Sequence, residues 1–437
     1  MLDREEVLDR FQRVRTRTRA MFDLLDEQAY YSRPIALRNP IVFYEGHLPA
    51  FAVNTLIKRG LGEPGIDAHL ETIFARGIDP ESEALAVARG NPAWPSRAEV
   101  RAYAEEADLR IATAFQHATL EVAGHPLLDA AQAVWAILEH EEMHQETLAY
   151  MWHQLSYASK RKPVSYRTLT PPHEAPAADQ VRIPAGEVTI GTRPAEGFAW
   201  DNERPAHCAR VAAFTIDAYN VTNARFMAFV EAGGYQDPRW WSAADLEWLA
   251  SDRVAHPPFW EQGSDGWYQR GMFERVPLPG SWPVYVTWAE ANAYARWQGA
   301  RLPTEAEFHR AAFGTIDGAE RRYPWGETLN GAAPPANFDF RRWDPEPVAA
   351  HPEGASAFGV HDLVGNGWEW TATPFGPFDG FAPLPSYPEY SAEFFDGEHY
   401  VMKGASPVTA RELTRRGFRN WFRPRYPYVY ATFRCVR

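Results

Sequence analysis

The chain has 437 residues, of which 45% are hydrophobic and 23% are charged, and this composition predicts a globular protein with room for two or three domains. Its formal net charge of −13 argues against nucleic acid or an anionic membrane as the main partner, because both attract basic surfaces. No apolar run approaches a membrane span, and the N-terminal stretch lacks the apolar core of a signal peptide, so a cytoplasmic enzyme is the expected class.

The first part of the chain is expected to be helical. Residues 5–28, 49–58, 96–125 and 127–159 read as helices. Ser96 followed by Glu99 is a capping box at the start of the third helix. Four such segments predict an antiparallel bundle over residues 1–160, and bundles place metal ligands on inward-facing helix positions. A linker rich in Pro, Ala and Thr is expected over residues 161–179.

The last predicted helix contains the string HEEMHQE, in which His140 and His144 lie one helical turn apart. Both imidazoles can therefore reach a single ion. A metal site needs at least a third ligand, and a surface helix that happens to carry two histidines explains the pair equally well. Glu141 and Glu146 are candidates to hold the second nitrogen of a ligand histidine, although a solvated helix face also explains them.

Residues 180–437 have a different sequence pattern, with short β-type runs and many glycines and tryptophans. Helices are expected there only over residues 223–232 and 288–298. This pattern predicts a second domain of irregular α+β type. The two cysteines, Cys208 and Cys435, are too few for a disulfide framework, and their surroundings do not suggest a metal site.

This second region contains the strings RIPAGEVTIGT, RLPTEAEFHRAA and GNGWEWT and ends in FRCVR. From about Arg182 to Val436 it resembles the formylglycine-generating-enzyme-like (sulfatase-modifying-factor, C-type-lectin-like) fold. Formylglycine-generating enzymes use a reactive cysteine pair near the C-terminus. Here only Cys435 lies in that region and Cys208 is far away in the sequence, so that chemistry is not expected.

A DinB-like four-helix bundle followed by this fold is similar to the EgtB-like sulfoxide synthases of ergothioneine, ovothiol and selenoneine biosynthesis. The resemblance covers nearly the whole chain and implies an iron-dependent oxidoreductase that uses O2. It would form a C–S or C–Se bond on the imidazole of hercynine. By the family's pattern, His47 would join His140 and His144 to hold Fe(II), and neutral imidazoles suit that ion.

The resemblance also implies substrate-binding and catalytic residues. In RNWFRP, Asn420 and Trp421 would face hercynine, whose trimethylammonium group favours an aromatic surround. Tyr387 and Tyr390 lie in the Pro-rich loop where relatives keep a proton-donating tyrosine. Core packing for the tryptophan and turn anchoring for the tyrosines explain these residues equally well without the family context. Relatives keep carboxylate-binding arginines in a stretch that here contains Arg76, Arg89, Arg97 and Arg101.

Two positions depart from the mycobacterial pattern. Phe422 stands where an Asp helps to hold γ-glutamylcysteine, and Met143 stands where a Gln often contacts hercynine. Loss of a polar contact in a discriminating site points to another second substrate. We therefore favour a selenoneine-synthase type (SenA-like) that takes a selenium donor such as a selenosugar. The alternatives are an ergothioneine or ovothiol sulfoxide synthase using cysteine or γ-glutamylcysteine, a zinc-dependent DinB-type thiol transferase, and a non-catalytic ligand-binding module.

Overall fold

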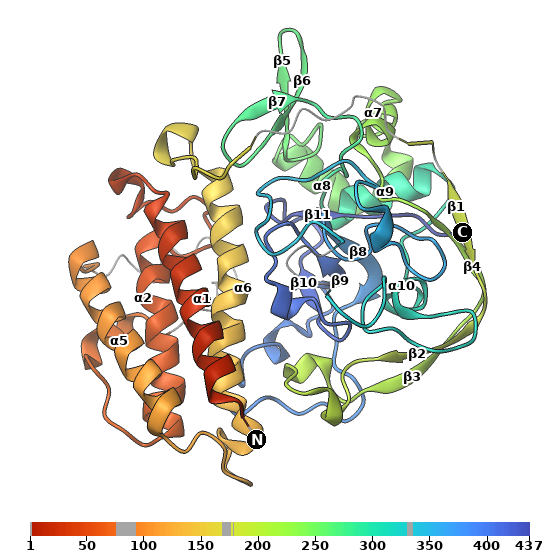
Figure 1. Cartoon of the computed structure of the whole chain (residues 1–437). Coiled ribbons are helices and arrows are strands. Elements are labelled where there is room, and N and C mark those ends of the chain that lie inside the picture. The colour runs from red at the N-terminus through yellow and green to blue at the C-terminus, as the bar shows by residue number, and fades with distance from the viewer. Residues whose placement is uncertain (1, 76–92, 168–175, 178, 330–334) are drawn as a thin grey trace. The chain divides into compact units, whose positions relative to one another are not determined.

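The computed structural model describes residues 2–75, 93–167, 176–177, 179–329 and 335–437 (Figure 1). Its contacts divide the chain into two compact units. The first comprises Met1–Val164 and Leu384–Pro388, and the second comprises Ser165–Pro383 and Glu389–Arg437. A short segment from late in the sequence therefore belongs to the first unit. Among the described residues, no helix is both long enough and apolar enough to span a membrane.

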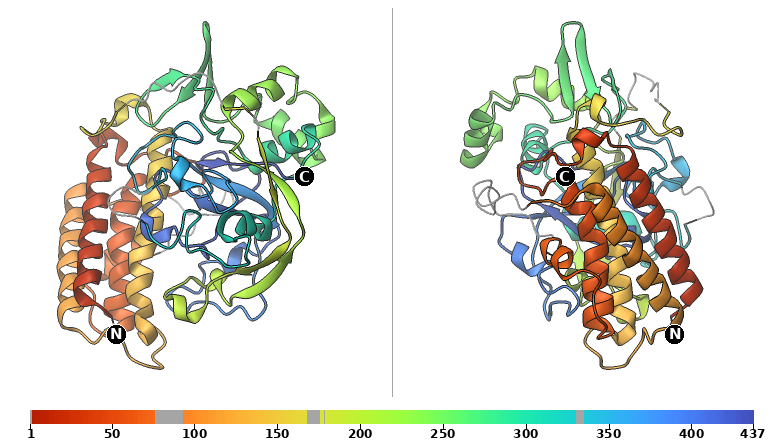
Figure 2. Two further views of the ribbon diagram at one scale, coloured as in Figure 1. Left: turned by 45° about the vertical axis from the view of Figure 1, so that its right-hand side comes forward. Right: turned by 90° about the vertical axis from the view of Figure 1, so that its left-hand side faces the viewer.

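The first unit is a helical bundle. Its long helices lie side by side in Figure 1 and in the two views of Figure 2, and their bounds are Arg4–Asp23 (α1), Ile41–Ala52 (α2), Arg97–His117 (α5) and Gln132–Gln154 (α6). A short helix, Ala68–Ile73 (α3), packs against α2. The expected capping box at the start of α5 is confirmed, because the Ser96 side chain accepts from the Glu99 backbone and Glu99 bonds back to Ser96.

The second predicted helix was placed wrongly. It was expected to start at Pro49, but α2 starts at Ile41, contains Pro49, and continues as a π-helix, Val53–Gly60 (η2). Proline normally begins a helix because it lacks the N–H that an interior position requires. Here every residue of α2 is buried, so packing outweighs the lost hydrogen bond. The shift matters because it places His47 on the helix and not on a loop before it.

The second unit is built from small sheets. The largest has the order β10–β9–β8–β11, with strands Gly367–Pro374 (β8), Tyr400–Ala405 (β9), Asn420–Phe422 (β10) and Ala431–Thr432 (β11). The pairs are antiparallel except for β11, which runs parallel to β8. The other strands are Gln180–Ile183 (β1) with Phe214–Asp217 (β4), Gly186–Ile190 (β2) with His207–Val211 (β3), and Trp260–Gly263 (β5), Gly266–Arg270 (β6) and Arg275–Pro277 (β7).

Four α-helices are described in this unit, Asn223–Glu231 (α7), Ala243–Ser251 (α8), Trp288–Trp297 (α9) and Glu305–Phe313 (α10). The sequence predicted α7 and α9 and missed the other two. Strand β8 is buried from Gly367 to Thr371, which explains its tryptophan-rich sequence. Glu369 on this strand forms a bidentate ion pair with the Arg434 guanidinium, at 2.7 and 2.6 Å, with both side chains fully buried. The C-terminal FRC string thereby ties the end of the chain to the central sheet.

Candidate metal centre

Three histidines meet inside the helical unit. His47 lies on α2, and His140 and His144 lie one turn apart on α6. One potential ligand atom of each lies within 4.8 Å of the others, and the Nε2 atoms of His47 and His140 are 3.2 Å apart. His47 and His140 are each 1% exposed, so water can solvate neither ring from outside. Among the described residues this is the one group of three or more His, Cys, Asp or Glu side chains with metal-ligand spacing.

Backbone carbonyls fix the protonation pattern of two of these rings. Nδ1 of His47 donates to the Phe74 carbonyl at 2.7 Å, and Nδ1 of His144 donates to the His140 carbonyl at 3.0 Å. A carbonyl oxygen only accepts, so each Nδ1 carries the hydrogen and each Nε2 carries a lone pair. Ligand histidines in metal sites are commonly oriented by such a second hydrogen bond.

A glycine allows the Phe74 carbonyl to reach His47. A Cβ atom on Gly46 would lie 2.3 Å from the Phe74 ring, well inside van der Waals contact. Phe74 follows α3 and is fully buried. The residue before His47 must therefore be small for α3 to approach α2 at this point.

The His140 ring is held by aromatic packing. Phe51 stacks on it with ring centroids 3.6 Å apart and planes at 11°, while Nδ1 of His140 is buried without a hydrogen-bond partner. Phe43 stacks in the same way on His47, with centroids 5.0 Å apart. Sequence reasoning missed both phenylalanines. The spacing of Phe43, His47 and Phe51 along one helix face would have indicated them had α2 been started at Ile41.

The electrostatics favour neutral imidazoles. Burial lowers the pKa of His47 to about 4 and that of His144 to about 3. The pKa of His140 lies well below its usual value, because of burial first and the neighbouring imidazoles second. Three neutral imidazoles fit a divalent transition metal, because Nε2 of His47 and of His144 keep their lone pairs and Nε2 of His140 lies 3.2 Å from that of His47.

The glutamates on α6 have other partners. Oε1 of Glu141 accepts from Arg15 at 2.8 Å and from Thr18 at 2.5 Å. The expectation that Glu141 or Glu146 holds a ligand histidine is wrong, because carbonyls bond Nδ1 of His47 and His144 and Nδ1 of His140 has no partner. The string HEEMH also satisfies the spacing of zinc proteases, in which the first Glu acts as base. Glu141 is taken up by an arginine and cannot fill that role.

Tyr387 lies beside the histidine cluster, in the segment that joins the helical unit. Its ring centroid is 5.9 Å from that of His140 and 5.3 Å from that of Phe51. Met143 is half-buried on α6 next to His144.

The remaining predicted site residues lie in the second unit. Asn420, Trp421 and Phe422 form β10 and are half-buried. Trp421 stacks on Phe375 with centroids 4.2 Å apart and planes at 5°. Tyr390 packs against both Trp200, at 4.2 Å between centroids, and Trp421, at 5.2 Å. The two candidate tyrosines thus belong to different units: the Tyr387 ring packs against His140, and Tyr390 is part of an aromatic cluster around Trp421.

Two of the candidate arginines can be assigned. The guanidinium of Arg97 lies 3.5 Å from Glu45, and Arg101 bonds Glu45 at 3.2 Å and Asp23 at 2.7 Å. Their charges are used inside the bundle. Arg76 and Arg89 lie outside the described residues.

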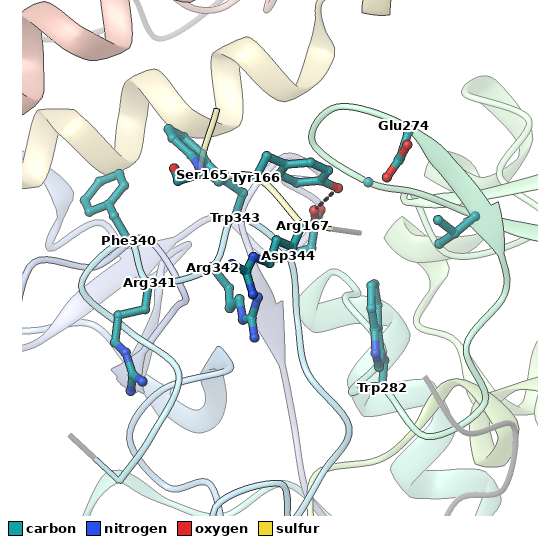
Figure 3. A pocket seen from close by; sticks show the side chains of 12 residues that line it. Ser165, Tyr166, Arg167, Glu274, Trp282, Phe340, Arg341, Arg342, Trp343 and Asp344 are labelled. Carbon is teal, nitrogen blue, oxygen red and sulfur yellow. Dashed lines mark hydrogen bonds between the residues drawn. The ribbon is translucent and has the colours of Figure 1, made fainter. Parts of the chain in front are cut away.

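The second unit also has a cavity of about 180 Å³ next to β7 (Figure 3). The Tyr166 hydroxyl points across it and donates to Asp344 at 2.8 Å. None of the residues predicted for the site lines this cavity. It shares no residue with the candidate metal centre.

Known proteins match both units. The sulfatase-modifying factor enzyme 1-like domain matches residues 166–437, and the DinB superfamily matches residues 10–148. The hercynine oxygenase of Mycolicibacterium thermoresistibile is 39% identical over 308 residues, which cover 69% of this chain and 67% of the relative. That of Mycolicibacterium smegmatis is 38% identical over 312 residues, covering 69% of this chain and 70% of the relative.

A longer match supports the same relationship. Ergothioneine biosynthesis protein 1 of Neurospora crassa is 28% identical over 95% of this chain and 55% of its own length. The matches thus include both the helical region and the sulfatase-modifying-factor region. The chain belongs to the hercynine oxygenase (EgtB-like) family, with a DinB-type helical bundle and a formylglycine-generating-enzyme-like α+β domain.

Proposed function

We propose that this protein is a non-haem iron enzyme that uses O2 to join sulfur or selenium to the imidazole carbon of hercynine. The observation that carries the proposal is the cluster of His47, His140 and His144, with the first two buried and the third partly buried, in a chain related to hercynine oxygenases. Fe(II) would be held by these three imidazoles. When bound, it would supply the capacity to bind and reduce O2.

The reaction balances with O2 as the only oxidant. The imidazole C–H and the thiol S–H are lost and a C–S bond forms. One oxygen atom ends on sulfur as a sulfoxide, and the other leaves as water with the two hydrogens. The protein must deliver a proton to the oxygen atom that leaves, and the Tyr387 hydroxyl is the proposed source because its ring packs against His140.

The aromatic cluster around Trp421 supports a role in binding the trimethylammonium group of hercynine. Phe375 and Tyr390 pack against this residue and Trp200 packs against Tyr390, and aromatic faces attract quaternary ammonium groups. Asn420 precedes Trp421 on β10 and is proposed to contact hercynine with it. Tyr390 is proposed as part of this surround, and as a second candidate proton donor.

The identity of the donor rests on two apolar positions. Phe422 stacks on Tyr426, with centroids 4.9 Å apart, and Met143 sits half-buried beside His144. The Phe422 side chain cannot pair with the amino group of γ-glutamylcysteine, and the Met143 side chain offers hercynine no amide group. We propose that cysteine or a selenium donor such as a selenosugar is preferred, with the selenium donor favoured.

The experiment supplies Fe(II), O2 and hercynine with cysteine, γ-glutamylcysteine or a selenosugar in parallel and identifies adducts by mass spectrometry. A C–Se adduct supports selenoneine synthesis, and a cysteine adduct supports a sulfoxide synthase. Turnover with γ-glutamylcysteine alone would refute the donor assignment while leaving the reaction class in place. Absence of oxygen uptake with every donor would favour a non-catalytic binding module, and zinc in the active protein would favour a thiol transferase.

A further inference from the structure

We propose that Arg59 and Gln132 are positioning residues that fix the segment Leu384–Pro388, and with it the Tyr387 ring, beside the three histidines. This inference rests on the proposed function, because it assigns the two residues a role through Tyr387. No sequence motif indicates a role for either residue. Both bond to backbone atoms of the segment.

The arginine forms a two-point anchor. Nη2 of Arg59 donates to the Pro385 carbonyl at 2.7 Å, and Nη1 donates to the Ser386 carbonyl at 3.1 Å. The planar guanidinium presents donors in a fixed fork, so two consecutive carbonyls are held in one orientation. These are the two peptide units that directly precede Tyr387.

A glutamine supplies the third point. The Ser386 N–H donates to Oε1 of Gln132 at 3.3 Å, and the Tyr387 N–H closes a turn onto the Leu384 carbonyl at 2.9 Å. Ser386 is 1% exposed although it lies in a loop. The main-chain groups of the two peptide units before the Tyr387 Cα are thus satisfied by the helical unit or by the turn itself.

The anchors lie on the elements that carry the histidines. Arg59 is in the last turn of η2, which continues the helix of His47, and Gln132 starts α6, about two turns before His140. The segment is therefore fixed by hydrogen bonds to both of the helical elements that carry the histidines. The anchors add fixed backbone positions to the ring contacts that Tyr387 makes with Phe51 and His140. A displacement of about 1 Å in a reacting group can cost a factor of about 100 in rate.

The variants are Arg59→Ala, Arg59→Lys, Gln132→Ala and Gln132→Glu. Arg110→Ala is the matched control, because Arg110 also donates to two consecutive carbonyls, those of Pro64 and Gly65, at 3.2 and 3.3 Å within the same unit. The first measurement is amide hydrogen exchange in the metal-free protein, read at the Ser386 and Tyr387 amides. We expect exchange there to rise about tenfold in Arg59→Ala and Gln132→Ala. The Lys and Glu variants should restore part of the protection, and Arg110→Ala should match the wild type.

The second measurement is the ratio of C–S or C–Se adduct to oxidised donor, with iron content determined on the same samples. Arg59→Ala should lower this ratio towards the value of Tyr387→Phe without loss of iron. The double variant Arg59→Ala with Tyr387→Phe should have a ratio no lower than that of Tyr387→Phe alone. Unchanged exchange, or a loss of iron in Arg59→Ala, would overturn the proposal. Raised exchange together with an unaltered product ratio in Tyr387→Phe would instead refute the proton-donor role of Tyr387 and leave the anchoring in place.

Discussion

At the scale of single residues, the candidate site is a set of buried imidazoles whose orientations are imposed by their surroundings. Carbonyls hold His47 and His144, whereas the face of Phe51 holds His140. Burying polar rings such as those of His47 and His140 is costly unless they are neutral and find partners. A metal ion that accepts their lone pairs would offset that cost, which is why the cluster reads as a site and not as core packing.

Replacement of His140 by Ala should abolish iron binding and activity together and leave the helical content unchanged. His153→Ala is the control, because His153 is a buried histidine on the same helix outside the cluster. Iron per protein, measured by plasma mass spectrometry, is expected to fall to near zero only in the first variant. Full iron occupancy in His140→Ala would contradict the assignment.

The lowered pKa values predict acid sensitivity of the metal-free protein. His47 has a pKa of about 4 when folded and an ordinary value of 6.5 when unfolded, so between these values the unfolded chain binds more protons. The free energy of unfolding should therefore fall as the pH drops from 6.5 to 4, by about 3 kcal/mol from His47 alone. Urea titrations across this range test it, and His47→Asn should lose that part of the slope. An identical slope in the variant would show that His47 does not cause it.

At the scale of elements, the sequence predicted that the site residues lie on or near helices, but it predicted the first and last residues of those helices less well. The His140–His144 spacing needed only helical periodicity, and α6 supplies it. Pro49 misled the placement of α2, because a local helix-start signal was outweighed by tertiary burial. The Phe74 carbonyl had no sequence signal, since any residue type offers a backbone oxygen.

Gly46→Ala should destabilise the protein, although glycine to alanine inside a helix normally stabilises by about 0.5–1 kcal/mol. The added methyl would overlap the Phe74 ring, and overpacking of this kind costs about 1–3 kcal/mol. Displacing Phe74 should also weaken iron binding, because His47 would lose its acceptor. Gly376→Ala is the control, because a methyl there meets no atom within 4 Å. Thermal melts measure the stability and iron titrations measure the affinity for iron. A Gly46→Ala variant that is more stable than the wild type would contradict the packing argument.

At the scale of the whole molecule, the two units have separate cores and separate candidate roles. All three histidines and Tyr387 belong to the first unit, and the aromatic cluster around Trp421 belongs to the second. The change in sequence pattern along the chain and the motifs shared with the family predicted both the helical bundle and the α+β domain. It could not predict that Leu384–Pro388 joins the helical unit, because a contact with residues more than 200 positions earlier leaves no local pattern.

Arg434→Met should test the independence of the two roles. It removes one partner of a fully buried ion pair and leaves Glu369 uncompensated, which costs about 3–5 kcal/mol. Unfolding of the second unit should shift to lower denaturant, while iron per protein in the folded sample stays at the wild-type value. Glu369→Gln combined with Arg434→Met should recover part of the loss, since no buried charge remains. Loss of iron in a folded Arg434→Met would mean that the second unit contributes to the metal site.

The most direct measurement of the central claim is the reaction itself under ¹⁸O₂. Protein loaded with Fe(II) is incubated with hercynine and a thiol or selenium donor, and the masses of the products are determined by mass spectrometry. We predict an adduct of the two substrates that lacks two hydrogens and, for a thiol, carries one ¹⁸O atom, and no adduct with His140→Ala. Unconsumed hercynine with only oxidised donor formed, or equal turnover by His140→Ala, would contradict it.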